Sequence, residues 1–194
     1  MLFLVSMVLA FPDTAPGVVL PAQVVVQGLS GAETTGRWPN HRGALLFFLD
    51  RECPVSNGYA PEMARLAQLA RSGKLAVLGI YSDQSITIQE AIQHAKEYAL
   101  RFDVVVDKAQ SLATASGVVI VPQAVIADSK GQTVYRGRIN DLYSADGTRR
   151  LMATRHDLRN ALEAFMANKA VSAAGGEPFG CPLATPTNST NPRK

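Results

Sequence analysis

Two continuous apolar runs set the layout of this chain. Residues 44–49 read Ala-Leu-Leu-Phe-Phe-Leu, and residues 75–81 form a second run of the same kind. Because neither run alternates apolar with polar positions, both are predicted to be strands buried on two faces of a sheet. Shorter strands are predicted at residues 24–26 and 104–106, where three valines follow one another.

The segments between and after these runs favour helices and one hairpin. Apolar side chains recur at helical spacing in four of them. The predicted helices cover residues 62–72, 87–101, 110–116 and 154–167. Gly117 suits the left-handed position that ends the third helix.

A β-hairpin is predicted late in the chain. Residues 123–127 and 133–139 have strand composition, and the turn Asp128-Ser129-Lys130-Gly131 joins them. Alternating strands and helices, then a hairpin and a last helix, predict an α/β fold with a central mixed sheet flanked by helices.

Cys53 is the first candidate for chemistry, because it follows the first buried strand directly and precedes a helical pattern. At a helix N-terminus, free backbone N–H groups and the helix dipole favour a thiolate over a thiol. Pro54 fits just inside a helix start, where its missing N–H costs nothing. The alternative is a structural cysteine that only fills space beside the strand.

The sequence around Cys53 resembles the redox centre of the thioredoxin-like superfamily, which includes the redoxins of the alkyl hydroperoxide reductase/thiol-specific antioxidant (AhpC/TSA) type. Cys53-Pro54-Val55-Ser56 is similar to a Cys-x-x-Cys motif with Ser56 in place of the second cysteine. Val121-Pro122 is similar to the cis-proline loop of these proteins. The resemblance covers residues 24–167 and implies a thioredoxin-like fold with extra N-terminal strands.

The resemblance also implies roles for individual residues. Cys53 would attack a disulfide or a peroxide, Ser56 would hydrogen-bond the sulfur, and Pro122 would shape the substrate groove. Cys181, followed by Pro182, is similar to the resolving cysteine of two-cysteine peroxiredoxins and would resolve the product. The chain after residue 168 is long enough to reach Cys53, about 40 Å when extended, but whether the two cysteines pair is left open.

The resemblance implies a thiol-disulfide oxidoreductase or thiol-dependent antioxidant that uses Cys53 as its nucleophile, and three alternatives stay open. The first is a peroxidase of this family, which would have Pro in place of Leu46, Thr in place of Asp50 and Arg in place of Pro122. The negative charge of Asp50 would also oppose formation of the Cys53 thiolate. In a thioredoxin-like copper chaperone, Asn57 would be a second cysteine. A non-catalytic interaction module is the third alternative. We expect no metal and no cofactor.

Composition limits the domain organisation and the partners. The chain has 194 residues and a net charge of +3, with basic residues spread along it, so no nucleic-acid surface is predicted. We divide it into a truncated export signal and linker (1–21), one domain (22–167) and a flexible tail carrying Cys181 (168–194). The apolar stretch 2–11 is too short to span a membrane.

The expected partners are a protein or small-molecule disulfide, or a peroxide, together with a reducing thiol partner. The expected location is extracytoplasmic, in the periplasm, with the cytoplasm as the alternative.

Overall fold

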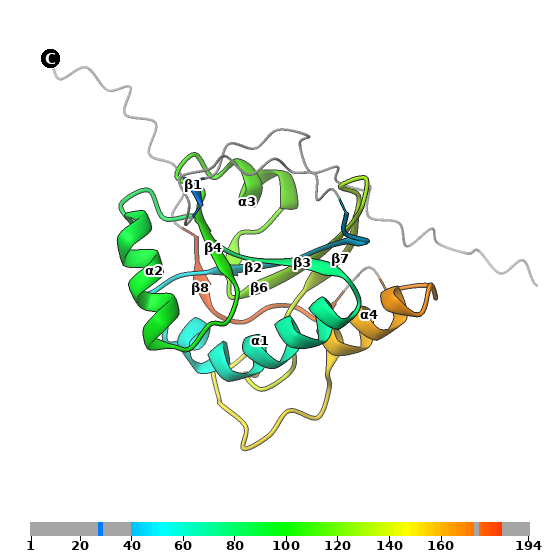
Figure 1. The fold of residues 1–194 in the computed structure, drawn as a ribbon. Coiled ribbons are helices and arrows are strands. Elements are labelled where there is room, and N and C mark those ends of the chain that lie inside the picture. Colours follow the sequence, from blue (N-terminus) through cyan, green and yellow to red (C-terminus); the bar gives the residue numbers. More distant parts are fainter. Residues whose placement is uncertain (1–26, 29–39, 173–174, 184–194) are drawn as a thin grey trace, which may run out of the picture.

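The computed structural model describes residues 27–28, 40–172 and 175–183 (Figure 1). The strands of these residues are β1 (Gln27–Gly28), β2 (Gly43–Leu49), β3 (Leu75–Tyr81), β4 (Asp103–Val106), β5 (Ile120–Val121), β6 (Gln123–Asp128), β7 (Thr133–Gly137) and β8 (Cys181–Pro182). The helices are α1 (Pro54–Ser72), α2 (Ile88–Glu97), α3 (Ser111–Ser116) and α4 (Asp157–Met166).

A mixed sheet with strand order β1-β4-β3-β2-β6-β7 forms the centre of the domain. β2 and β3 are parallel, as are β3 and β4, whereas β6 pairs antiparallel with both β2 and β7. β5 and β8 form a separate antiparallel pair. The predicted α/β architecture is therefore confirmed, including the hairpin of β6 and β7.

β2 is buried on both faces, which explains its unbroken apolar sequence. Alternate side chains of the strand pack into two different hydrophobic clusters. The cluster that contains Phe47 includes residues of α1, α2 and α4, and the cluster that contains Phe48 includes residues of α3. Figure 1 shows α1 and α4 on one face of the sheet and α3 on the other.

The helix after β2 begins at Pro54, well before the predicted start at residue 62. Its first turns contain Gly58 and a second proline, Pro61, which lower helix propensity and obscured the pattern. Packing compensates for this low helix propensity, because Tyr59 and Met63, on one face of α1, are buried in the core. Tertiary burial thus outweighs local propensity here.

Two further helix boundaries differ from the predictions. α2 ends at Glu97, and Ala99 adopts the left-handed region (φ 52°), which stops the helix before residue 101. α4 begins at Asp157 rather than at Thr154. The backbone and side chain of Thr154 instead donate hydrogen bonds to Asp141, at 2.7 and 2.6 Å.

The N-terminal predictions lie mostly outside the described residues. This applies to the export signal and linker (1–21) and to the strand at 24–26. The part that is described, β1, pairs antiparallel with β4 at the sheet edge. Among the described helices, none is both long and apolar enough to cross a membrane.

Candidate active site

Cys53 occupies the junction between β2 and α1, where it is the N-cap residue of the helix. Its backbone is extended (φ −80°, ψ 111°), and the residue is only 2% exposed. Pro54 follows at the first helical position, and the N–H of Asn57 donates to the Cys53 carbonyl at 3.0 Å. The sulfur therefore belongs to the residue at the positive end of a 19-residue helix, a setting that favours a thiolate when the sulfur is reduced.

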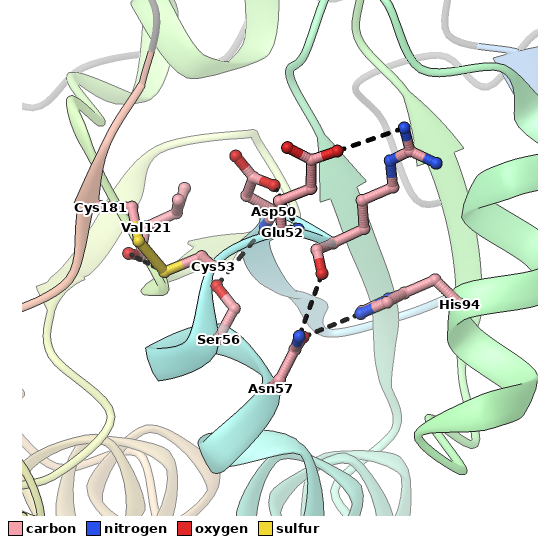
Figure 2. Close-up of a disulfide and its surroundings, with 9 residues drawn as sticks. Asp50, Glu52, Cys53, Ser56, Asn57, His94, Val121 and Cys181 are labelled. Atoms are coloured by element: carbon pink, nitrogen blue, oxygen red, sulfur yellow. Dashed lines mark hydrogen bonds and ion pairs between the residues drawn. A yellow bond between two sulfur atoms is a disulfide. The ribbon is translucent and has the colours of Figure 1, made fainter.

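Cys53 forms a disulfide with Cys181 (Figure 2). The two Cα atoms are 6.0 Å apart, a usual separation for a disulfide. These are the two cysteines of the sequence, so neither is free. The structure thus pairs the cysteines whose relationship the sequence left open.

The predicted cis-proline loop lies against this disulfide. The Val121-Pro122 peptide bond is cis, and the Val121 carbonyl oxygen is 3.6 Å from Cys53 Sγ. Val121 also faces Cys181 directly in the antiparallel pair of β5 and β8. The expectation of a cis Val121-Pro122 bond in a loop that faces Cys53 is confirmed.

Residues 175–183 form an extended segment, called the strap below, that brings Cys181 to the site. At its start, the N–H of Gly175 donates to the Arg136 carbonyl at 3.2 Å. At its end, the N–H of Leu183 donates to the Val119 carbonyl at 2.9 Å. The predicted tail therefore contacts the domain over the strap, while residues 184–194 lie outside the described part.

Ser56 lies in the first turn of α1, close to Cys53 (Figure 2). The residue is 2% exposed, and its Oγ accepts a hydrogen bond of 3.4 Å from the Asp50 N–H. The Asp50 carboxylate in turn accepts a hydrogen bond of 2.8 Å from the Glu52 N–H. Ser56 therefore links the first turn of α1 to the turn that precedes Cys53. A hydrogen bond from Ser56 to the Cys53 sulfur stays a prediction.

A buried network next to the disulfide was not predicted. Tyr81 Oη lies 2.6 Å from His94 Nδ1. His94 Nε2 lies 2.8 Å from Asn57 Oδ1 (Figure 2). Asn57 Nδ2 donates to the Arg51 carbonyl at 3.0 Å, which fixes the orientation of the amide. Asn57 Oδ1 can only accept a hydrogen bond, so we assign the ring proton of neutral His94 to Nε2, which donates to it. His94 Nδ1 is then an acceptor, and the Tyr81 hydroxyl donates to it.

The side chain of Arg51 forms ion pairs with two carboxylates. Its guanidinium forms an ion pair of 2.9 Å with Glu90 and a longer one of 3.4 Å with Glu52. Glu90 also completes the capping box of α2 with Thr87. Arg51 thus links the turn before Cys53 to the start of α2.

Burial lowers the pKa of His94 below its usual value of 6.5. Glu97 and Asp50 oppose this shift, and Arg51 reinforces it. The shift favours the neutral imidazole in the folded protein, in agreement with the hydrogen-bonding pattern.

The neutral His94 should make stability depend on pH. As the pH falls through 6.5, the unfolded chain binds a proton at this residue before the folded one does, so the free energy of unfolding decreases. We expect His94→Gln to lose less stability than the wild type between pH 7.5 and pH 5, measured by urea unfolding. The matched control is His156→Gln, at an exposed histidine, which should follow the wild type. Parallel curves for wild type and His94→Gln would contradict this prediction.

Within the described residues, no three His, Cys, Asp or Glu side chains converge as a metal site. Asn57, which stands at the second cysteine position of a copper chaperone, is engaged with His94 and Arg51. The copper alternative therefore gains no support from the geometry of the site.

The cysteine at a strand-to-helix junction, the cis-proline loop and the mixed sheet define a thioredoxin-like redox protein. The model of the AhpC/TSA family matches residues 13–136, more than half of the chain. The chain belongs to the AhpC/TSA family. The comparison with curated proteins found no match.

Solved structures share the fold. A hypothetical protein from Sinorhizobium meliloti is 24% identical, with 88% of this chain and 94% of that chain covered and a TM-score of 0.72. An uncharacterized conserved protein from Geobacillus kaustophilus is 20% identical, with coverage of 92% and 100% and a TM-score of 0.72. The thioredoxin domain of a thiol-disulfide oxidoreductase from Bacteroides vulgatus is 16% identical, with coverage of 79% and 99% and a TM-score of 0.58. At these identities the likeness establishes the fold alone.

Proposed function

We propose that this protein is a thiol-disulfide oxidoreductase in which Cys53 is the nucleophile and Cys181 the resolving cysteine. The observation that carries the proposal is the Cys53–Cys181 disulfide held against the cis Val121-Pro122 loop. Membership of the AhpC/TSA family supports thiol-based redox chemistry. The peroxidase alternative is less favoured, because Asp50 stands where that subgroup has a threonine hydroxyl.

The oxidative half-reaction takes two thiol-disulfide exchanges. The Cys53 thiolate attacks one sulfur of a partner disulfide, forming a mixed disulfide and releasing the other partner sulfur as a thiolate. The Cys181 thiolate then attacks Cys53 Sγ, which forms the Cys53–Cys181 disulfide and releases the second partner sulfur. The partner gains two electrons and two protons, and the cysteine pair loses them.

A reducing dithiol partner restores the thiols, and burial indicates where it attacks. Cys53 is 2% exposed, whereas Cys181 is partly exposed. Attack on Cys181 Sγ also makes Cys53 the leaving thiolate, which the N-terminus of α1 stabilises. The second thiol of the donor then releases Cys181. In this scheme the reducing partner reacts at Cys181, and the disulfide substrate reacts at Cys53.

The test is the reaction of the fully reduced protein with oxidised glutathione and, separately, with hydrogen peroxide, followed by alkylation and mass measurement. We expect oxidised glutathione to convert the wild type to the Cys53–Cys181 disulfide. The variant Cys181→Ser should stop at a glutathione mixed disulfide on Cys53, because no second thiol resolves it. In this assay the wild type serves as the control for full turnover.

A different outcome would assign a different reaction. If oxidised glutathione leaves both thiols free while peroxide forms the pair quickly, the protein is a peroxidase and the proposal fails. If Cys181→Ser forms no glutathione mixed disulfide while Cys53→Ser forms one on Cys181, Cys53 is not the nucleophile.

We also propose an extracytoplasmic location. Disulfides persist in oxidising compartments and are rare in the cytosol, and the Cys53–Cys181 pair is closed in this structure. Alkylation of intact cells with a membrane-impermeant maleimide after mild reduction tests it: labelling of Cys181 supports the proposal, and labelling only after lysis contradicts it.

A further inference from the structure

The strap adds a strand to the edge of β5. Ile120 faces Pro182 and Val121 faces Cys181 in antiparallel register, and the Leu183 N–H continues the pairing to the Val119 carbonyl. Extended peptides bind exposed strand edges in this way, with backbone hydrogen bonds for affinity and side-chain contacts for selectivity. The chain itself therefore occupies the edge next to the nucleophile.

Gly180 permits the close approach of the strap to this edge. A Cβ atom added at Gly180 would overlap the Val121 carbonyl oxygen and would lie 3.0 Å from Pro122 Cδ. The φ angle of Gly180 is not in the left-handed region that requires glycine, so the need is for space. The residue directly before the paired cysteine must therefore lack a side chain in this register.

Apolar contacts hold the strap on both sides of Cys181. Phe179 packs against the core cluster on the α1 face, and Leu183 packs against the cluster on the α3 face. The Phe179 ring also lies against Gly147 in the loop before α4. These contacts define a pattern of an aromatic residue, glycine, cysteine and, two positions later, an apolar residue.

We propose that the Ile120–Val121 edge selects partner segments with glycine directly before the reacting cysteine, and that the strap is the intramolecular competitor for this edge. The inference rests on the proposed function, because it concerns the partner that exchanges with Cys53. In the exchange, the Cys53 thiolate attacks the partner cysteine Sγ, the mixed disulfide forms, and the sulfur previously bonded to that cysteine leaves as a thiolate. The edge admits the partner only when the strap is undocked.

The experiment uses three full-length reduced proteins. Cys181→Ser keeps a strap that can dock but cannot pair, and Gly180→Val with Cys181→Ser carries a strap excluded by the Val121 carbonyl. Glu177→Ala with Cys181→Ser is the matched control, because Glu177 is an exposed strap residue. Circular dichroism and urea unfolding verify that each protein is folded, and Gly180→Ala with Cys181→Ser provides a milder second variant.

The probes are acetyl-Phe-Gly-Cys-Pro-Leu-amide and the same peptide with valine in place of glycine, each activated as a thiopyridyl disulfide. Release of thiopyridone gives the rate, which is normalised to the rate with free glutathione to remove intrinsic differences between the peptides. We expect the glycine peptide to react about tenfold or more faster than the valine peptide, since forcing a side chain into occupied space costs binding of this order. We also expect the glycine peptide to react faster with the Gly180→Val protein than with Cys181→Ser or the Glu177→Ala control.

Equal normalised rates for the two peptides, or no gain on undocking the strap, would overturn this inference and leave the proposed function standing. If Cys53 reacts with neither peptide nor 2,2′-dithiodipyridine in any of the proteins, the proposed function fails, and the inference fails with it.

Discussion

Reducing the Cys53–Cys181 disulfide is expected to lower the free energy of unfolding by about 5 kcal/mol. The bond joins residues separated by 128 positions in sequence, so it closes a loop over most of the domain. In the chain-entropy model, such a crosslink removes a large part of the conformational freedom of the unfolded chain. An effect of this size is a large share of the 5–15 kcal/mol that is typical of a whole domain.

Urea unfolding with and without dithiothreitol measures this effect. The oxidised protein should also show the smaller m-value, because its unfolded chain is more compact. Cys181→Ser is the control: it should unfold like the reduced wild type in both conditions. A difference below about 1 kcal/mol between the oxidised and reduced wild type would contradict the expectation and indicate that the reduced unfolded chain stays compact.

Replacing Cys53 with serine is expected to lower the rate of disulfide exchange by on the order of a thousandfold or more. A serine hydroxyl is not ionised at neutral pH, so the helix N-terminus that supports a thiolate has no anion to stabilise. Reduction of a protein disulfide such as that of insulin, followed by turbidity, measures the loss. Circular dichroism establishes that the variant is folded.

A rescue variant separates the nucleophile from the resolving thiol. Cys181→Ser should form the first mixed disulfide and then stall, and adding Ser56→Cys to it should restore turnover. Ser56 lies in the same turn of α1 as Cys53, so a thiol there would be present at high effective concentration. If Cys53→Ser keeps its activity and Cys181→Ser loses it, the roles of the two cysteines must be exchanged.

The elements that the sequence predicted well are those whose burial leaves a continuous pattern. β2 and β3 match the two apolar runs to within one residue, because both strands are covered on both faces. Val121-Pro122 was identified by its resemblance to a loop rather than by any periodicity. The first two turns of α1 were missed, because Gly58 and Pro61 depress the local helix signal that packing later overrides.

The contacts that the sequence could not supply are those made at long range. β5 and β8 contain two residues each, too few to show a period, and their pairing depends on the path of the strap. His94 is one of three histidines in the chain, and no local motif singles it out. Its partners, Tyr81 and Asn57, lie 13 and 37 positions away, and no local pattern connects them.

The path of the strap also bears on the solubility of the protein. β7 is an edge strand of the sheet. Near the end of β7, the strap forms backbone hydrogen bonds with the Arg136 carbonyl and with the Arg138 N–H. Backbone groups left open on an edge are templates for pairing with another copy and hence for aggregation. When the strap undocks, these backbone groups are uncovered. Arg138 is paired with Asp157, so the charged side chain that remains to oppose edge-to-edge association is that of Arg136.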